Sequence, residues 1–218
     1  MLKIENVETH GIKATIRGMR NPKNSWKLSD SGCGQLPLSN ESVYLVGDKD
    51  RKLMVSLASN GPVHAKYRRM MVVYLDVTAP LYWWKEFDTY KVGTVSNSCS
   101  TMHKVHAKKF VMSDFSIEHL EHGKTVGNSI SAYDLMSSTI DMLNYYRNLF
   151  LDTKNKKYWW QMIQLLPSSY NQKRTIMLNY EVLTNIYESR KGHKLDEWQT
   201  FRSWIDTLPL KELIDIKR

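Results

Sequence analysis

The sequence predicts an α+β fold in which a small mixed or antiparallel sheet packs with helices and the C-terminal half is largely helical. Runs of alternating or β-branched apolar residues lie in the first 80 residues, which is typical of strands. Apolar residues at three- to four-residue spacing dominate after residue 130, which is typical of helices. This order, strands first and helices after, indicates the α+β class.

The chain of 218 residues is long enough to bury one core, and its composition does not require a second domain. We therefore expect a single domain over residues 1–218. Its first half, 1–110, is expected to contain the sheet and a pocket loop at 89–104. Its second half, 111–218, is expected to be mainly helical.

The N-terminal segment begins with residues 1–18, whose alternation of apolar and polar side chains predicts a strand or a hairpin broken at His10-Gly11. The next segment, to about Ser42, is rich in glycine, serine and proline and is predicted to be a loop. Arg17 and Arg20 lie at its start. They are either solvated or contacts for an anionic ligand, because loops carry much of a protein's binding chemistry.

The central segments are a helix, a strand and a second helix. Residues 48–60 predict the first helix, which the glycine and proline at 61–62 end. The β-branched run that follows Met70 predicts a strand, which stops at Pro80 because proline cannot donate a ladder hydrogen bond. Residues 81–91 then predict a short helix with one aromatic face.

A dense row of small hydroxyl and amide side chains follows this helix and begins at Gly93. Aromatic rings can stack on a ligand, hydroxyls and amides can hold oxygen atoms, and Lys91 and Lys104 add positive charge. The row therefore predicts a pocket wall, although a connection that caps a helix uses the same residue types. The candidate ligand contacts in the row are Thr94, Ser96, Asn97 and Cys99.

The C-terminal half contains a loop at 111–124 and four predicted helices. Each helix has apolar residues at helical spacing, and Gly192 ends the third. The predicted helices cover residues 131–151, 156–165, 172–190 and 195–208.

The charge balance favours anionic partners. Lysine and arginine number 31 against 22 aspartates and glutamates, a formal net charge of +9. The two cysteines, Cys33 and Cys99, do not make a disulfide framework, and no apolar run is long enough to span a membrane. We therefore expect a cytoplasmic protein without membrane segments.

No motif in the sequence indicates a metal. Two H-x-x-H pairs, at His103 and His106 and at His119 and His122, lack carboxylates or cysteines at metal-ligand spacing. The sequence also lacks a glycine-rich dinucleotide fingerprint, a P-loop and a G-x-S-x-G elbow. Cys99 would need a base to act as a nucleophile, and a small residue in a tight loop is its more common role.

The order of these segments resembles the flavin-dependent thymidylate synthases, a family that methylates dUMP with reduced FAD and a folate. The resemblance spans most of the chain. Asn179 follows Pro167 by twelve positions and Arg190 follows Asn179 by eleven, which is similar to the family's L-P…N…R spacing. In the family this arginine contacts the pyrimidine nucleotide. The resemblance further implies a homotetramer whose ligand sites are shared between subunits.

The pocket loop falls where the family carries R-H-R-x-x-S-x-N-x-x-S-x-R-Y. In this chain Thr89, Tyr90 and Lys91 stand at R-H-R, Thr94 at the first serine, Ser96 at the asparagine, Cys99 at the second serine, and Thr101-Met102 at R-Y. The family uses the replaced arginines and histidine to hold flavin and the nucleotide phosphate. The resemblance therefore implies FAD as the cofactor, but the replacements in this motif argue against FAD binding.

Three functions compete. The first is a non-catalytic protein that binds or sequesters an anionic, signalling nucleotide in clefts between subunits, as a phage or bacterial antagonist of host defence would. The second is a divergent flavin-dependent thymidylate synthase, which would make the protein an enzyme that acts on dUMP with FAD and a folate. The third is a single-stranded nucleic-acid binder, which requires charge and exposed aromatic side chains along one groove.

We rank the nucleotide-binding protein first, because the motif arginines are replaced while the positive charge survives. No catalytic residue and no metal ligand is assigned. The candidate nucleotide-binding residues are Arg17, Arg20, Lys91, Thr94, Ser96, Asn97, Cys99, Asn179 and Arg190.

Overall fold

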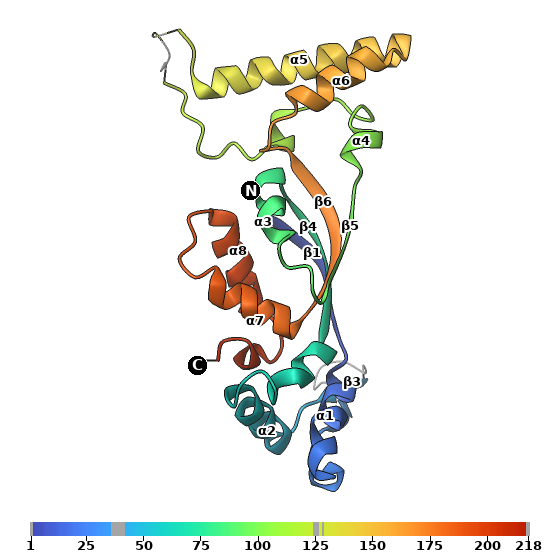
Figure 1. Cartoon of the computed structure of the whole chain (residues 1–218), viewed down its shortest axis with the longest axis vertical. Coiled ribbons are helices and arrows are strands. Elements are labelled where there is room, and N and C mark those ends of the chain that lie inside the picture. The colour runs from blue at the N-terminus through green and yellow to red at the C-terminus, as the bar shows by residue number, and fades with distance from the viewer. Residues whose placement is uncertain (1, 36–41, 124–126, 128, 217–218) are drawn as a thin grey trace. The chain divides into compact units, whose positions relative to one another are not determined.

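The computed structural model describes residues 2–35, 42–123, 127 and 129–216, and it confirms the α+β class (Figure 1). The strands are β1 (Lys3–His10), β2 (Gly32–Gln35), β3 (Ser42–Leu45), β4 (Val72–Pro80), β5 (Thr94–Ser98) and β6 (Asn171–Asn179). The helices are α1 (Ile12–Arg20), α2 (Asp48–Ser59), α3 (Leu81–Phe87), α4 (Thr101–Lys104), α5 (Ala132–Thr153), α6 (Lys156–Leu165), α7 (Tyr180–Ser189) and α8 (Asp196–Ile205).

Four strands form the larger sheet, in the order β1-β4-β6-β5. Strand β4 forms because every second side chain is apolar and buried. Val73, Leu75, Val77 and Ala79 are each at most 1% exposed. Pro80 is its last residue, as the sequence predicts. Strands β2 and β3 make a separate antiparallel pair, which lies partly within the segment predicted to be a loop.

The chain forms two compact units. Unit 1 comprises Met1–Glu5, Asp76–Thr89 and Ser96–Thr175. Unit 2 comprises Asn6–Leu75, Tyr90–Val95 and Ile176–Arg218. Each strand of the four-stranded sheet contributes residues to both units. The single domain expected from the sequence stays a prediction.

The core of unit 1 lies under the α5–α6 pair, whose two helices run side by side (Figure 1). Ser131 is the N-cap of α5 and forms a capping box with Asp134. The Ser131 side chain accepts a hydrogen bond from the Asp134 amide, and the Asp134 carboxylate accepts one from the Ser131 amide. Asn155 caps α6 with a single side-chain bond, which its oxygen accepts from the Lys157 amide. The buried side chains of this core are Val105, Phe110, Phe115, Met136, Ile140, Leu143 and Met162.

Unit 2 is held by a buried arginine and by the α7–α8 pair. The Arg68 side chain is 1% exposed, and it pairs with Glu181 at 2.7 Å while donating to the Leu213 carbonyl at 3.0 Å. These bonds join Glu181 of α7 to the segments that contain Arg68 and Leu213. Trp198 and Phe201 of α8 are fully buried next to α7.

The predicted helices at 48–60, 131–151, 156–165 and 195–208 are confirmed with shifts at their ends. The helix predicted at 81–91 is shorter and ends at Phe87. In each confirmed case the apolar spacing matches a single helical face, so local pattern and tertiary packing agree.

The prediction of a strand through residues 12–18 is wrong, because this segment is helix α1. The side chains that α1 buries, Ile16 and Met19 among them, follow helical spacing. The sequence did not separate the two, because the alternation of Ile12, Ala14 and Ile16 fits a strand, while Ile12 and Ile16 are also about one helical turn apart. Gly11 breaks the strand with a φ of 91°.

The prediction of a helix from residue 172 is wrong in its first half. Residues 171–179 form β6, with Ile176 and Leu178 buried at alternate positions, and the helix starts only after Asn179. Ile176 and Tyr180 are four residues apart, which suggested one continuous helix, yet one lies in the strand and the other in α7. The predicted polar loop likewise contains strand β5, whose side chains are mostly exposed.

We predict that Gly11→Ala destabilises the protein more than Gly61→Ala. Both glycines have a φ near 90°, but a Cβ on Gly11 would lie 2.1 Å from the Met70 carbonyl oxygen, and a Cβ on Gly61 would meet no atom within 4 Å. Gly61→Ala should cost about 1–2 kcal/mol of unfolding free energy from the left-handed backbone alone. Gly11→Ala should cost roughly 1–3 kcal/mol more from the clash. Urea unfolding measures both values, and equal costs would contradict the prediction.

Candidate functional site

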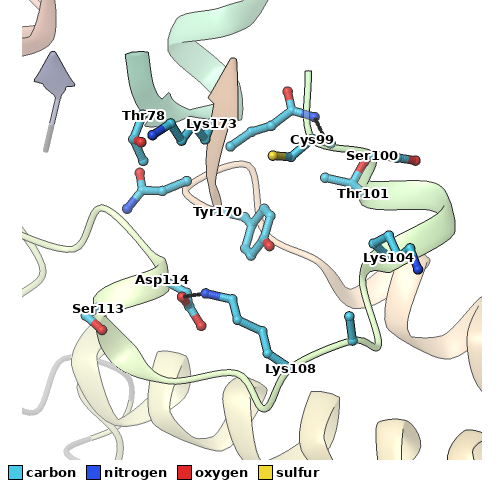
Figure 2. Close-up of a pocket in the computed structure, with 13 residues that line it drawn as sticks. Thr78, Cys99, Ser100, Thr101, Lys104, Lys108, Ser113, Asp114, Tyr170 and Lys173 are labelled. Carbon is cyan, nitrogen blue, oxygen red and sulfur yellow. Dashed lines mark hydrogen bonds and ion pairs between the residues drawn. The ribbon is translucent and has the colours of Figure 1, made fainter. Parts of the chain in front are cut away.

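A polar cavity of about 340 Å³ lies in unit 1, where the chain passes from β5 to α4 and β6 begins (Figure 2). Its wall on the β5 side consists of Cys99, Ser100 and Thr101. The Cys99 amide donates to the Lys173 carbonyl at 2.9 Å, and the Gln172 side chain donates to the Cys99 carbonyl at 2.8 Å. These bonds fix the row of small residues at the edge of the cavity.

Ser100 turns the chain at this edge. Its side chain accepts from the His103 amide at 3.0 Å and so caps the short helix α4. The sequence alternatives of a pocket wall and a helix cap are therefore both present: Ser100 caps the helix, and the neighbouring residues line the cavity.

Three lysines line the cavity, and only one of them lacks a carboxylate partner among the described residues. Lys173 pairs with Asp76 at 3.1 Å, and a hydrogen bond with that carboxylate raises the pKa of Lys173. Lys108 is bonded to Asp114, which raises the pKa of Lys108. Lys104 has no carboxylate partner among the residues that the structure describes. An anion in the cavity would therefore meet one lysine that its own surroundings do not neutralise.

Tyr170 is the aromatic member of the cavity. Figure 2 shows its ring between Cys99, Ser100 and Thr101 on one side and Lys108 with Asp114 on the other. Burial raises the pKa of Tyr170, so the hydroxyl stays protonated and can donate a hydrogen bond at neutral pH. A protonated phenol, small hydroxyls and lysines are a donor set that suits a phosphate or carboxylate.

A second cluster surrounds Arg190 in unit 2. The guanidinium carbon of Arg190 lies 4.4 Å from the ring centre of Trp198 and 5.4 Å from that of Tyr90. Arg190 Nε also donates to Tyr90 Oη at 2.9 Å, and this hydroxyl shares a hydrogen bond with Ser189 at 2.7 Å. The plane of the guanidinium is therefore set by aromatic stacking and by one directional bond.

Asn179 caps the helix that ends beside Arg190. Its side chain accepts from the Val182 amide at 3.1 Å. Gly93 lies against it with a φ of 80°, and a Cβ there would come within 2.6 Å of Asn179 Nδ2. The interval between Asn179 and Arg190 is thus the length of α7 with its two end positions.

The predicted site residues fall into both units. Cys99 lines the cavity of unit 1, and Ser96 and Asn97 are exposed on β5 in the same unit. In unit 2, Lys91 is exposed ahead of β5, while Thr94 is partly buried and its hydroxyl has no partner among the described residues. Their binding roles stay predictions.

Arg17 and Arg20 lie on α1 in different surroundings. Arg17 is exposed, whereas Arg20 is 5% exposed and donates to Asp50 at 2.6 Å. Burial alone would raise the pKa of Asp50, but hydrogen bonds from Ser29, Ser31 and Arg20 outweigh burial and lower it. Arg20 is therefore the internal counter-charge of a buried carboxylate, an arrangement that does not support its predicted ligand role.

Sequence reasoning missed Lys108, Tyr170 and Lys173 as cavity residues, and Tyr90 and Trp198 as the partners of Arg190. Lys108 belongs to a visible basic run, but nothing local indicates that Tyr170 and Lys173 face it from the start of β6. No group of three or more potential metal ligands occurs among the described residues. None of the helices in the described part of the chain is long and apolar enough to cross a membrane.

Comparisons with known proteins find likeness in structure alone. No protein-family model matches the sequence, and no curated protein matches it. Thymidylate synthase X from Helicobacter pylori, crystallised with FAD and dUMP, aligns over 99% of this chain and 100% of its own, with 15% identity and a TM-score of 0.67. A second structure of that species' flavin-dependent synthase ThyX, complexed with FAD and dUMP, aligns over 98% of each chain with 15% identity and a TM-score of 0.67.

A third similar structure is the UMP/dUMP methylase PolB from Streptomyces cacaoi bound with 5-Br dUMP. It aligns over 97% of this chain and 93% of its own, with 13% identity and a TM-score of 0.61. The chain therefore has the fold of the flavin-dependent thymidylate synthases, which confirms the fold that the sequence resemblance implies.

We predict that Arg20→Ala lowers the free energy of unfolding by about 3–5 kcal/mol, because it leaves the Asp50 carboxylate buried without a counter-charge. Arg17→Ala on the same helix is the control and should change stability by less than about 0.5 kcal/mol. Guanidinium unfolding gives both values. If Arg20→Ala keeps wild-type stability but binds the nucleotide more weakly, the prediction is wrong and Arg20 is a ligand contact.

Proposed function

We propose that this protein binds an anionic pyrimidine nucleotide of the dUMP type and does not catalyse its methylation. The observation that carries the proposal is the likeness, over nearly the whole chain, to three structures that hold dUMP or 5-Br dUMP. The net charge of +9 suits such a ligand.

The cavity of unit 1 is the proposed anion site. Its volume of about 340 Å³ falls at the lower end of small-molecule pockets, which is enough for a phosphate with part of a nucleoside. Lys104 supplies unneutralised charge, and Tyr170 with Thr101 supplies neutral donors. Because Lys108 and Lys173 are already paired with carboxylates, they add less net charge to the cavity than Lys104 does.

Arg190 is the proposed pyrimidine contact in unit 2. The resemblance assigns the base-contacting arginine to this position, and the surroundings of Arg190 support it. Stacking on Trp198 and the bond to Tyr90 hold the guanidinium in one orientation, which reduces the entropy that a bound ligand would otherwise have to freeze. A fixed planar fork of donors suits the carbonyl edge of a pyrimidine.

The residues at the family's R-H-R positions do not fit the family's way of holding flavin. Tyr90 uses its hydroxyl within the protein, with Arg190 and Ser189. Lys91 is exposed, and Thr89 bonds back to the Glu86 carbonyl at 2.7 Å. We therefore derive no chemical step through FAD and favour a binding protein over an enzyme. The homotetramer with shared clefts, and the sequestration of a signalling nucleotide, belong to this proposal.

We predict that Arg190→Ala and Lys104→Ala each weaken dUMP binding by about tenfold or more, since a hydrogen bond to a charged group contributes about 1.5–3 kcal/mol. Isothermal titration calorimetry measures the dissociation constants. Arg202→Ala and Lys109→Ala are the matched controls. Arg202 also stacks on a tyrosine, Tyr187, and Lys109 is an exposed neighbour of the cavity that does not line it.

Both control variants should keep wild-type affinity within about twofold, a difference of only about 0.4 kcal/mol in binding free energy. Undetectable dUMP binding by the wild-type protein would overturn the proposal. Affinity unchanged in Lys104→Ala would overturn the proposed role of the cavity, and affinity unchanged in Arg190→Ala would overturn the proposed role of Arg190.

The visible absorption spectrum separates the binder from the divergent enzyme. We expect no flavin bands in the purified protein and no spectral change on adding FAD, because the R-H-R positions lack the arginines that would hold it. The native mass of the same sample reports the oligomer. Stoichiometric flavin would favour the enzyme, and an assay of dUMP methylation with FAD and a folate would then decide.

A further inference from the structure

Five basic side chains gather around the turn between α5 and α6 in unit 1. They are Arg147 on α5, Lys154 at its C-cap, Lys156 and Lys157 at the start of α6, and Lys104 at the end of α4. None of the five forms an ion pair with a carboxylate of the described residues.

Other cations of the same unit are neutralised by contrast. Lys108 pairs with Asp114, Lys173 pairs with Asp76, and Arg174 pairs with Asp88 at 2.7 Å. These three cations of unit 1 thus have acidic partners, whereas the five at the turn have none among the described residues. A concentration of like charge costs stability by self-repulsion unless a counter-charge arrives from outside the chain.

His106 shows that three of these charges converge. Burial, followed by the charges of Lys154, Lys104 and Arg147, lowers the pKa of His106, so the imidazole is neutral at physiological pH. Arg147 Nε donates to the His106 carbonyl at 3.0 Å, and the buried His106 Nδ1 has no hydrogen-bond partner among the described residues. The end of α4 and the C-terminal part of α5 thus face one region, and α6 begins two residues after Lys154.

Aromatic side chains alternate with these charges. Lys156 Nζ lies 5.9 Å from the ring centre of Trp160, and Lys157 Nζ lies 4.7 Å from that of Tyr158. Trp160 is 44% exposed and Tyr145 is 57% exposed. These two rings are accessible although large aromatic side chains are usually buried for most of their area.

The helices that carry these rings are fixed by packing within unit 1. The ring of Tyr146 on α5 stacks on the ring of Tyr158 on α6, with 6.3 Å between the ring centres. Trp159 packs against the buried core of unit 1, and its indole nitrogen donates to the Met102 carbonyl at 3.0 Å. The exposed Trp160 next to it is therefore presented from a fixed helix.

We propose that this α5–α6 basic surface, made of Lys104, Arg147, Lys154, Lys156 and Lys157 with the rings of Tyr145 and Trp160, binds single-stranded nucleic acid. Unpaired cations would contact successive phosphates, and exposed rings would stack on unpaired bases. A duplex would use the charges but leave the rings without a base face to stack on. A membrane surface would need a continuous apolar face at the turn, whereas charges and rings alternate there.

Lys104 belongs both to this surface and to the proposed dUMP cavity. The experiment separates the two proposals, because its variants change neither Arg190 nor a residue that lines the cavity. Fluorescence anisotropy of a labelled oligothymidylate of about 12 nucleotides measures binding between about 50 and 200 mM salt. The double variant Lys156→Glu/Lys157→Glu should bind at least about tenfold more weakly, with a salt slope smaller by about 1.4, since each single-strand phosphate contact contributes about 0.7.

Trp160→Ala should weaken binding by about fivefold or more without changing the salt slope, because it removes stacking and not charge. The matched control is Lys49→Glu/Lys52→Glu on α2, which changes the net charge by the same amount in unit 2. Residues 156, 157 and 49 lie in the first turn of their helices, where glutamate is favoured, and residue 52 is exposed on the next turn of α2, so both double variants should fold. Circular dichroism checks this, and dUMP titration of each variant should match the wild type.

Three results would overturn the proposal. The first is an equal loss of affinity in the two double variants, which would mean a general effect of net charge. The second is a duplex of the same length that binds as tightly as the single strand and is insensitive to Trp160→Ala. The third is binding to phosphatidylserine vesicles with no measurable binding of the oligonucleotide. Failure of dUMP binding alone would leave this proposal standing.

Discussion

Burial of the alternate side chains of β4 is the constraint on which the other elements depend. Val73, Leu75, Val77 and Ala79 are almost fully buried, so a shift of one residue would place polar groups in their positions. The strand runs through both compact units, and Pro80 ends it at the start of α3. In unit 1, α3 then buries Trp83, Trp84 and Phe87 against one another.

Two buried arginine–carboxylate pairs lie in the interior of unit 2 beside its apolar side chains. In unit 2, Arg20 with Asp50 and Arg68 with Glu181 bring together segments that are 30 and 113 residues apart in the chain. Buried ion pairs of this kind specify which segments meet more than they add net stability. The consequence for function is that two of the protein's arginines, which composition alone would count as ligand-binding charge, are used inside the fold.

The remaining cations are distributed unevenly over the surfaces of the proposed functions, and Lys104 belongs to two of these surfaces. In the cavity, Lys108 and Lys173 are neutralised locally while Lys104 is not, so the site combines a moderate field with neutral donors. At the α5–α6 turn the cations are unpaired and interleaved with rings. The Arg190 cluster is different again, because its charge is stacked on Trp198 and oriented by Tyr90. Tyr90 uses its hydroxyl within the protein, in its bond to Arg190.

The sequence by itself determined the elements whose apolar spacing fits only one period: β4, α2, α5, α6 and α8. It predicted the C-terminal end of α7 near Gly192 but not its start, because residues 171–179 form β6. It could not separate α1 from a strand or β6 from a helix, because an apolar pair four residues apart satisfies both periods, and only packing selects the buried face. Only the tertiary structure decided that Tyr170 and Lys173 meet Lys108 and that Arg20 is internal. These are contacts between distant segments, and no local pattern of residues encodes which of several similar charges finds a buried partner.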